Sequence, residues 1–437
     1  MSTAAADSAV HPYVAALLAG HGAVPEVPGW LSARRAAALE RANALAVPTT
    51  RDEEWRFTDL TPLTRLPVRP ATQASPLDAA VRSAHDLPEA AQRMTFIDGV
   101  LMPASQTAAL PAGVTVMPLT DALRSQPALV EPYLARLASS ENDLFTALNT
   151  AFLQHGVLIH VASDSVMNEP VHLLHLAAQA GVAAHPRCLI VAEPGARVCV
   201  IEEYAAAGDA AYLTNAVTEV AVAANAEVRH VKVQRESSKA FHIGHCTARL
   251  ERDARFASHT VTLGARLSRQ NLTVLQNGEG IEVTIDGLAL IGGRQLADTH
   301  TLIDHRQAHG RCSQTHKTIV GGGAHAVFNG KVFVREGAQL TDSSQQSRNL
   351  LLSDKARVDT KPQLEIFADD VKCAHGATVG QLDPEHLFYL KSRGLTEAAA
   401  RNLLTYAFGA EIIDRIPVPS LVRRLEAAVM AFTEGGA

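Results

Sequence analysis

The run AEVRHVKVQRESSKAFHIGHCTARLERDARFASHTVTL, residues 226–263, decides the fold of this chain. Its segments AEVRHVKV and FHIGHCTARLE alternate apolar and polar residues, which is the pattern of short β-strands, and RDARF is a small turn unit. Similar runs recur from Gly156 to about Leu382, among them GVLIHVA, ARVCVIEEY and AVFNGKVFV, while helical periodicity nearly vanishes. This region is therefore predicted to be β-structure throughout.

Small turn units of similar form separate the runs, for example PGARV at 194, ANAEV at 224 and EGIEV at 279. Their spacing of roughly 15 to 30 residues is consistent with the unequal coils of a β-solenoid. A small residue beside Asn, Asp or Gly suits a tight corner. A single-stranded β-helix accommodates this many short strands without intervening helices. An antiparallel multi-sheet fold would also satisfy the alternation.

Two helical regions flank the predicted β-helix core, which spans residues 156–382. Residues 1–155 form a helical and mixed region, with helical patterns at Leu31 to Leu45 and at 142–154 and a hairpin turn predicted at Asp98-Gly99. Residues 383–437 are helical again, because Asp383 followed by Pro384 is a typical helix start.

Composition excludes several classes of protein. The 437 residues are 47% hydrophobic and 19% charged with a net charge of −6, and no basic stretch points to nucleic acid. No segment approaches the ~20 apolar residues of a membrane span, and the N-terminus lacks a basic start followed by an apolar run. The five cysteines are scattered and never form a CxxC pair, which fits a reducing cytoplasm better than a disulfide scaffold.

The C-terminal helices carry apolar residues on more than one stripe. Covering one end of a solenoid requires a single stripe, so part of this surface is expected to meet a partner. The candidate docking residues are Leu387, Phe388, Leu390, Leu403, Leu404 and Phe408.

Cys373 and His375 stand where strand-like sequence gives way to helix. Side chains two apart on a strand project to the same side, so these two metal-binding residue types are expected to face one way. A metal site, a buried pair and a partner surface all remain consistent with the residues themselves.

Common catalytic motifs are missing from the sequence. Gly321-Gly322-Gly323 precedes Gly330-Lys331, but the GxxxxGK[ST] spacing of a phosphate loop is absent, so the chain is not expected to hydrolyse nucleotide. There is no HExxH among the 19 histidines. A carbohydrate-active β-helix enzyme stays open, because carboxylates are available at Asp298, Asp304, Asp342, Asp359, Asp369 and Asp370.

The run KCAHGATVGQLDPEHLFYLKSRGL, residues 372–395, resembles the C-terminal signature of the SufB/SufD family of iron–sulfur cluster assembly proteins, and the SufD branch in particular. Three further stretches agree with this resemblance and together span most of the chain. They are EEWRFTDL at 53–60, Phe328-Asn329-Gly330-Lys331, and SSQQSR at 343–348 with the NLLLSDKARVDTKPQLEIFADDVKC that follows it.

The resemblance implies a right-handed parallel β-helix that serves as a non-catalytic scaffold in a cytoplasmic complex with SufB and the ATPase SufC. It implies that His375 faces SufB as a candidate ligand of iron or of the nascent cluster, with Cys373 as a weaker candidate. The helices after Asp383 would dock SufC. SufB-like proteins carry a sulfur-accepting cysteine where this sequence has Gln346-Ser347-Arg348, and serine cannot carry a persulfide.

The lone chain is expected to bind no cofactor tightly, with iron or a cluster held transiently in the complex. In isolation the chain could pair with its own copy. A subunit that only stabilises the complex is the remaining alternative within the family.

Overall fold

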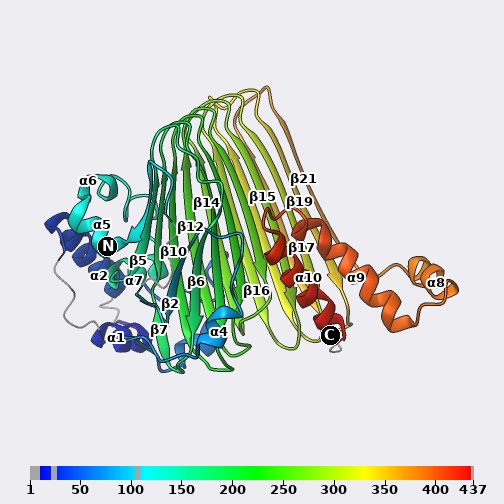
Figure 1. The fold of residues 1–437 in the computed structure, drawn as a ribbon. Coiled ribbons are helices and arrows are strands. Elements are labelled where there is room, and N and C mark those ends of the chain that lie inside the picture. Colours follow the sequence, from blue (N-terminus) through cyan, green and yellow to red (C-terminus); the bar gives the residue numbers. More distant parts are fainter. Residues whose placement is uncertain (1–9, 21–26, 104–108, 435–437) are drawn as a thin grey trace, which may run out of the picture.

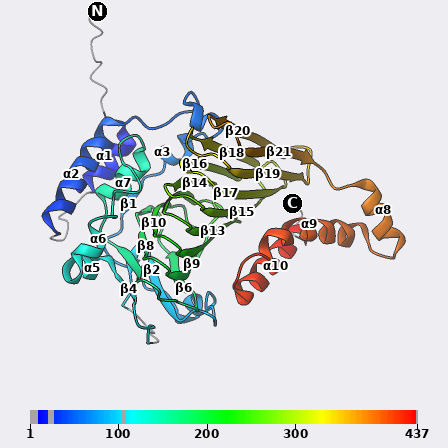
Figure 2. The same ribbon diagram turned by 90° about the horizontal axis from the view of Figure 1, so that it is seen from above.

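The computed structural model describes residues 10–20, 27–103 and 109–434 as a long β-solenoid of about eight turns with helices at both ends (Figure 1). Seen from above, the two sheets of the solenoid face each other, and helices α9 and α10 lie to one side (Figure 2). The first nine residues, on which the expected absence of a leader partly rests, lie outside the described residues. No described helix is long and apolar enough to cross a membrane.

Each coil contributes one strand to each of two sheets, here called sheet A and sheet B. Sheet A contains β4 (Val114–Pro118), β5 (Gly156–Val161), β7 (Val182–Ala184), β8 (Arg187–Ala192), β10 (Leu213–Val222), β12 (Phe241–Leu250), β14 (Leu267–Gln276), β16 (Leu296–His305), β18 (His325–Val334) and β20 (Arg357–Ile366), with the short β1 (Arg69–Pro70) paired to β7. Sheet B contains β2 (Gln92–Ile97), β3 (Val100–Leu101), β6 (Val171–Ala177), β9 (Arg197–Ala206), β11 (Glu227–Arg235), β13 (Arg255–Thr262), β15 (Glu282–Ile291), β17 (Arg311–Val320), β19 (Asp342–Leu351) and β21 (Lys372–Gly380).

The helices lie outside the solenoid in two groups, one from each end of the chain. The N-terminal group is α1 (Pro12–Ala19), α2 (Gly29–Ala44), a 3₁₀ turn (Glu53–Trp55), α3 (Thr61–Thr64), α4 (Ala79–Ser83), α5 (Leu119–Ser125), α6 (Pro127–Val130) and α7 (Leu144–Ala151). The C-terminal group is α8 (Pro384–Ser392), α9 (Glu397–Ile413) and α10 (Pro419–Glu434). Asp383 caps α8 as its sequence predicted, because its side chain accepts a hydrogen bond from the Glu385 N–H.

Parallel pairing between successive coils confirms the predicted solenoid and excludes the antiparallel alternative. Phe241 pairs with Leu267 in the next coil, 26 residues on, whereas His325 pairs with Arg357, 32 residues on. Antiparallel pairs among the described strands occur only in β2–β3 and β4–β5. The β2–β3 turn is the predicted hairpin at Asp98-Gly99, both with positive φ.

A column of left-handed corners runs along one rim of the solenoid. One residue per coil has a φ between 56° and 74°, and its N–H donates to a carbonyl of the next coil. These residues are Asp164, Gly195, Asn225, Asp253, Gly280, His309 and Leu340. Because Gly, Asn and Asp reach this conformation most readily, the turn units seen in the sequence mark these corners.

The interior is apolar along one side and polar along the other. Inward residues of both sheets, such as Val228 and Val283 of sheet B and Val274 of sheet A, build one continuous apolar cluster. Beside it the buried Glu202 carboxylate accepts hydrogen bonds from Thr218 Oγ1 at 2.6 Å and from Tyr204 Oη at 2.5 Å. Pairing offsets the cost of burying such polar groups, so Glu202 and its two donors form a hydrogen-bonded cluster on the polar side of the interior.

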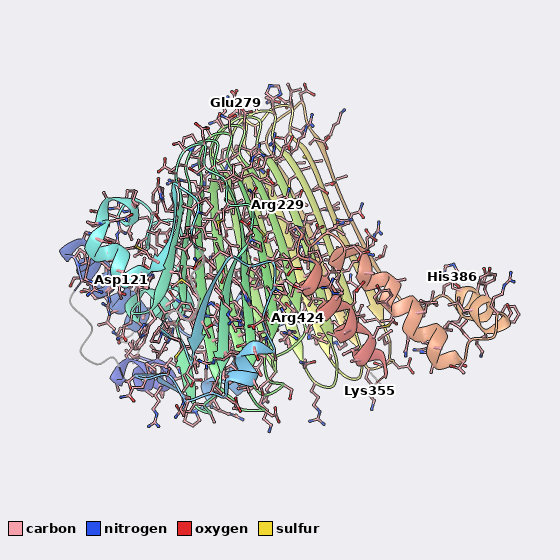
Figure 3. All side chains as sticks on the ribbon, viewed as in Figure 1. Asp121, Arg229, Glu279, Lys355, His386 and Arg424 are labelled. Atoms are coloured by element: carbon pink, nitrogen blue, oxygen red, sulfur yellow. The ribbon has the colours of Figure 1, made fainter. Side chains whose placement is uncertain are left out.

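The outer faces of the two sheets are covered by the two helical groups. On sheet B, Ile412 and Ile413 of α9 and Leu421 of α10 pack on a cluster of outward strand residues. The buried Glu203 lies within hydrogen-bond reach of His172 and His85 and forms ion pairs with Arg235 and Arg424, and this network ties α10 to the sheet. Figure 3 labels Arg424 on α10.

Replacing Gly195 by alanine tests the corner column. A Cβ there would meet Asp164 Oδ1 at 2.3 Å with φ at 74°, so the free energy of unfolding should fall by about 1–2 kcal/mol or more. Gly208 is the matched control, because it has no positive φ and a Cβ would have nothing within 4 Å. Equal urea midpoints for the two variants would contradict the assigned role of the corner.

Acid should destabilise the solenoid through its buried neutral histidines. Burial lowers the pKa of His305 to about 4, and both ring nitrogens lack a hydrogen-bond partner. Between the unfolded value of about 6.5 and pH 4 the unfolded chain binds a proton that the folded chain does not, so stability falls as pH falls by up to about 1.4 kcal/mol per pH unit. Between pH 7 and 5, the free energy of unfolding of His305→Leu, measured with urea, should therefore fall by about 2 kcal/mol less than that of wild type. Equal decreases in the two proteins would refute the assignment.

Candidate functional site at the open end of the solenoid

The last coil of the solenoid lacks a neighbour on its outer side. Strands β20 and β21 end the strand order of sheets A and B, and nearly every residue of β21 is exposed. Their outer backbone N–H and C=O groups form two adjacent unpaired edges, which is the form of surface that accepts further strands.

Cys373 and His375 both face the interior side of this last coil. They pair in register with Ser343 and Gln345 of β19, which are buried inside the solenoid. Cys373 is half-buried and packs against the end of the apolar interior, together with Leu364 and Val371. His375 is exposed, because no further coil covers it. The two donors therefore lie at an opening into the solenoid interior.

The cysteine of this pair is a poor metal ligand in the lone chain. Burial raises the pKa of the Cys373 thiol, and nearby Asp342 adds to the effect, while a backbone hydrogen bond at Ser343 opposes it. Two coils deeper in the same column, burial raises the pKa of Cys312 to about 12. Both sulfurs are therefore protonated near neutral pH. Because the thiolate is the form that binds metal, both are poor ligands in this state. Among the residues that the structure describes, no three His, Cys, Asp or Glu side chains group as metal ligands would.

Sequence reasoning missed the polar groups directly beneath His375. Gln345 is the register partner of His375, and the buried Ser347 follows two residues later on the same strand, with its Oγ 3.2 Å from Thr360 Oγ1. Gln345 and Ser347 belong to the SSQQSR stretch, but only strand alternation combined with the coil register shows that they point inward.

The C-terminal arm projects away from the solenoid beside this end (Figure 1), and Figure 3 shows His386 of α8 near its tip. No residue of α8 is buried, and Phe388 is 76% exposed and Leu403 41%. Leu387, Leu390 and Leu404 are half-buried. Phe408 differs from this set, because it packs on the solenoid cluster and the Lys317 Nζ lies 4.6 Å from its ring centre.

The clustered histidines of the sequence are dispersed in space. His300 and His325 point outward from sheet A and contact Asp298 and Asp359, while His305 and His316 are buried within the solenoid. His309 occupies a left-handed corner. These five residues therefore form no common site.

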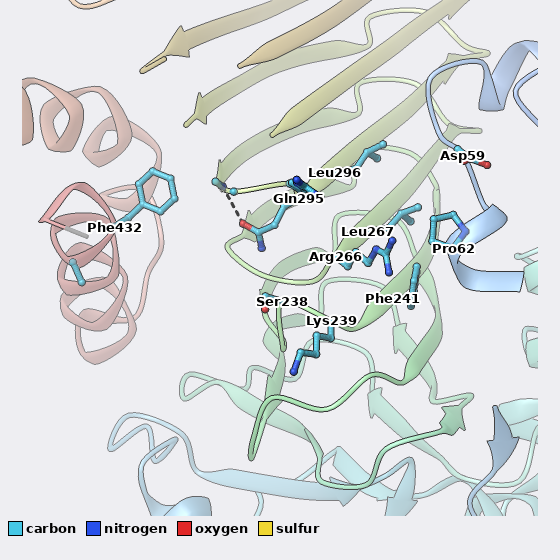
Figure 4. A pocket seen from close by; sticks show the side chains of 14 residues that line it. Asp59, Pro62, Ser238, Lys239, Phe241, Arg266, Leu267, Gln295, Leu296 and Phe432 are labelled. Atoms are coloured by element: carbon cyan, nitrogen blue, oxygen red, sulfur yellow. Dashed lines mark hydrogen bonds between the residues drawn. The ribbon is translucent and has the colours of Figure 1, made fainter. Parts of the chain in front are cut away.

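A cavity of about 1000 Å³ lies away from the open end, between turns of sheet A and the end of α10. Figure 4 shows Lys239 and Arg266 beside Phe241, with Phe432 across the cavity. Asp59 is its lining carboxylate, and one oxygen of Asp59 accepts hydrogen bonds from Thr61. This cavity offers no pair of carboxylates for glycoside hydrolysis.

A second cavity of about 500 Å³ is lined by four carboxylates, but each is held by a cation or imidazole. Although burial alone would raise the pKa of Asp298, Arg269 and His300 lower it to about 2, and a hydrogen bond from His300 lowers the pKa of Glu54. A glycosidase acid requires a raised pKa. The four contacts are Glu53–Lys361, Glu54–His300, Asp298–Arg269 and Asp359–His325.

Two family models cover nearly all of this architecture. Residues 25–173 match the SufBD protein N-terminal region, and residues 175–408 match the SufBD core domain of the SUF system for iron–sulfur cluster assembly. The chain belongs to the SufBD family of iron–sulfur cluster assembly proteins.

Relatives within the family agree over almost the whole length. The chain is 39% identical to an iron–sulfur cluster assembly SufBD family protein of Synechocystis sp., over 92% of this chain and 90% of that protein. It is 34% identical to the iron–sulfur cluster assembly protein SufD of Escherichia coli, over 91% and 92%, and 28% identical to SufD of Bacillus subtilis, over 92% and 94%. The resemblance to the SufD branch that the sequence motifs predicted is thereby confirmed.

Proposed function

We propose that this SufBD family protein is the SufD-type scaffold subunit of a cytoplasmic SufBCD complex, in which iron and the nascent cluster are cargo rather than resident cofactors. The observation that carries the proposal is the open last coil, where His375 and Cys373 face an unpaired double strand edge. Two donors are too few to hold iron alone, so the site needs ligands from a second chain.

SufB is the proposed partner at this open end. Both sheets can continue into another solenoid of the same construction, and main-chain hydrogen bonds would then satisfy the edges of β20 and β21. An edge built for a homologous chain can also accept a second copy of itself, so a homodimer is expected when the subunit is purified alone.

SufC is the proposed partner of the C-terminal arm. Phe388 and Leu403 are exposed, and the half-buried Leu387, Leu390 and Leu404 adjoin them. Phe408 packs against the solenoid, so its proposed role is to hold α9 in place. ATP hydrolysis is assigned to SufC, and this chain is proposed to be non-catalytic.

His375 is the proposed iron ligand, because its imidazole is exposed at the opening. Cys373 is proposed as its half-buried neighbour, which would bind only after losing its proton. The second candidate function is a subunit that only stabilises the complex. The half-burial of Cys373 against the apolar interior favours a structural role for that residue.

His375→Ala should leave the complex with SufB and SufC assembled and lower the yield of iron and sulfide on it by about ten-fold or more. The measurement is iron and sulfide analysis of the co-expressed, purified complex. Thr378→Ala is the control on the same strand, since its side chain faces the other way. An undiminished yield in His375→Ala would leave only the structural role.

Phe388→Asp should weaken SufC binding by about 30-fold or more without changing the stability of the subunit, because an exposed aromatic anchor is lost. Titration of the purified subunit with SufC by calorimetry measures the change. Glu385→Ala on the same helix should bind normally. Equal affinities for both variants would place the SufC site elsewhere.

A further inference from the structure

We propose that Gln345 is a positioning residue for His375: its side-chain carbonyl accepts the imidazole N–H and leaves the other ring nitrogen free to bind iron. This inference rests on the proposed role of His375. It concerns a buried residue that determines which ring nitrogen of His375 carries the proton.

Gln345 lies directly beneath His375 in the stacked coils. The two residues are register partners on β19 and β21, and both face inward. Neighbouring strands are about 4.8 Å apart, which is within reach of an amide and an imidazole. Gln345 is only 1% exposed, so water competes little for its side chain.

The orientation of the Gln345 amide is fixed from deeper in the solenoid. Burial lowers the pKa of His316 to about 3, so its ring is neutral, and its Nε2 lies 3.0 Å from Gln314 Nε2. Gln314 Nε2 also donates to Thr301 Oγ1 at 2.6 Å. With its nitrogen committed to these acceptors, Gln314 turns Oε1 toward the last coils, where it accepts from Gln345 Nε2 at 2.8 Å.

One hydrogen-bond acceptor in this series of contacts remains without a donor. Gln345 Oε1 is buried and has no hydrogen-bond partner. Native interiors pair nearly all such atoms, so an unpaired carbonyl next to the last coil points to a donor supplied from that side. His375 is the inward side chain in register there, and a neutral imidazole carries one N–H.

Gly330 on the facing sheet makes room for this arrangement. A Cβ at Gly330 would lie 2.3 Å from Gln345 Nε2 and 2.7 Å from its Cδ. A side chain at this position would therefore displace the amide. The Phe328-Asn329-Gly330-Lys331 stretch thus gains a physical role that its sequence did not reveal.

The chemical consequence is control of the histidine tautomer. A ring nitrogen that donates to Gln345 holds the proton, and the other nitrogen keeps its lone pair for a metal ion. Without the carbonyl, the proton would distribute between both nitrogens and the ring would turn freely.

The test uses the full chain labelled with ¹⁵N-histidine, with the His375 ring signals assigned through His375→Gln. In wild type, the two ¹⁵N shifts should report one tautomer; in Gln345→Leu, they should move toward the averaged values of a free imidazole. Gly330→Ala should shift them in the same direction. Gln346→Leu, whose side chain faces outward beside Arg348, should leave them unchanged.

Identical His375 shifts in wild type, Gln345→Leu and Gly330→Ala would overturn the proposal. Cluster yield in the co-expressed complex is the second readout, and Gln345→Leu should lower it several-fold. If His375→Ala lowers the yield but the ring shifts ignore Gln345, only this inference fails. If the shifts respond to Gln345 but His375→Ala has full yield, the positioning contact stands and the proposed function fails.

Discussion

In-register stacking of parallel coils is the constraint on which the rest of this structure depends. Each residue of one coil lies above its counterpart in the next, so every position along a coil becomes a column through the molecule. The left-handed corners, the apolar interior and the polar interior are all such columns. A column must end where the solenoid ends, and the last coil therefore exposes groups that are buried everywhere else.

Charge also follows a column and protects the register. The first residues of the sheet B strands alternate in sign through seven coils, and Arg255 and Glu282 among them approach to 3.4 Å. Skipping one coil would place like charges together, which makes misregistered stacking unfavourable. The column runs Arg197, Glu227, Arg255, Glu282, Arg311, Asp342 and Lys372, and ends on a positive charge at the open edge.

The same architecture explains why one chain can present an incomplete site without losing its fold. Successive coils bury the interior, and α9 and α10 are fixed on sheet B through Glu203 and through Lys317, whose Nζ donates to the Phe408 carbonyl at 2.9 Å. The open coil and the α8 arm need supply little stability, so both can present surface to other proteins. The C-terminal region is thus held on the solenoid by α9 and α10, while the α8 arm exposes apolar residues.

The sequence by itself determined the strands, the corners, the start of α8 at Asp383 and the common side of Cys373 and His375, because alternation, turn residues and capping are local. Tertiary structure alone decided that Gln345 lies under His375, that Gly330 faces Gln345, and that Phe408 packs inward while Phe388 stays exposed. The reason is the unequal coil: partners fall 26 residues apart at Phe241 and 32 apart at His325, so no fixed spacing connects one coil to the next. Columns form only once the coils are stacked.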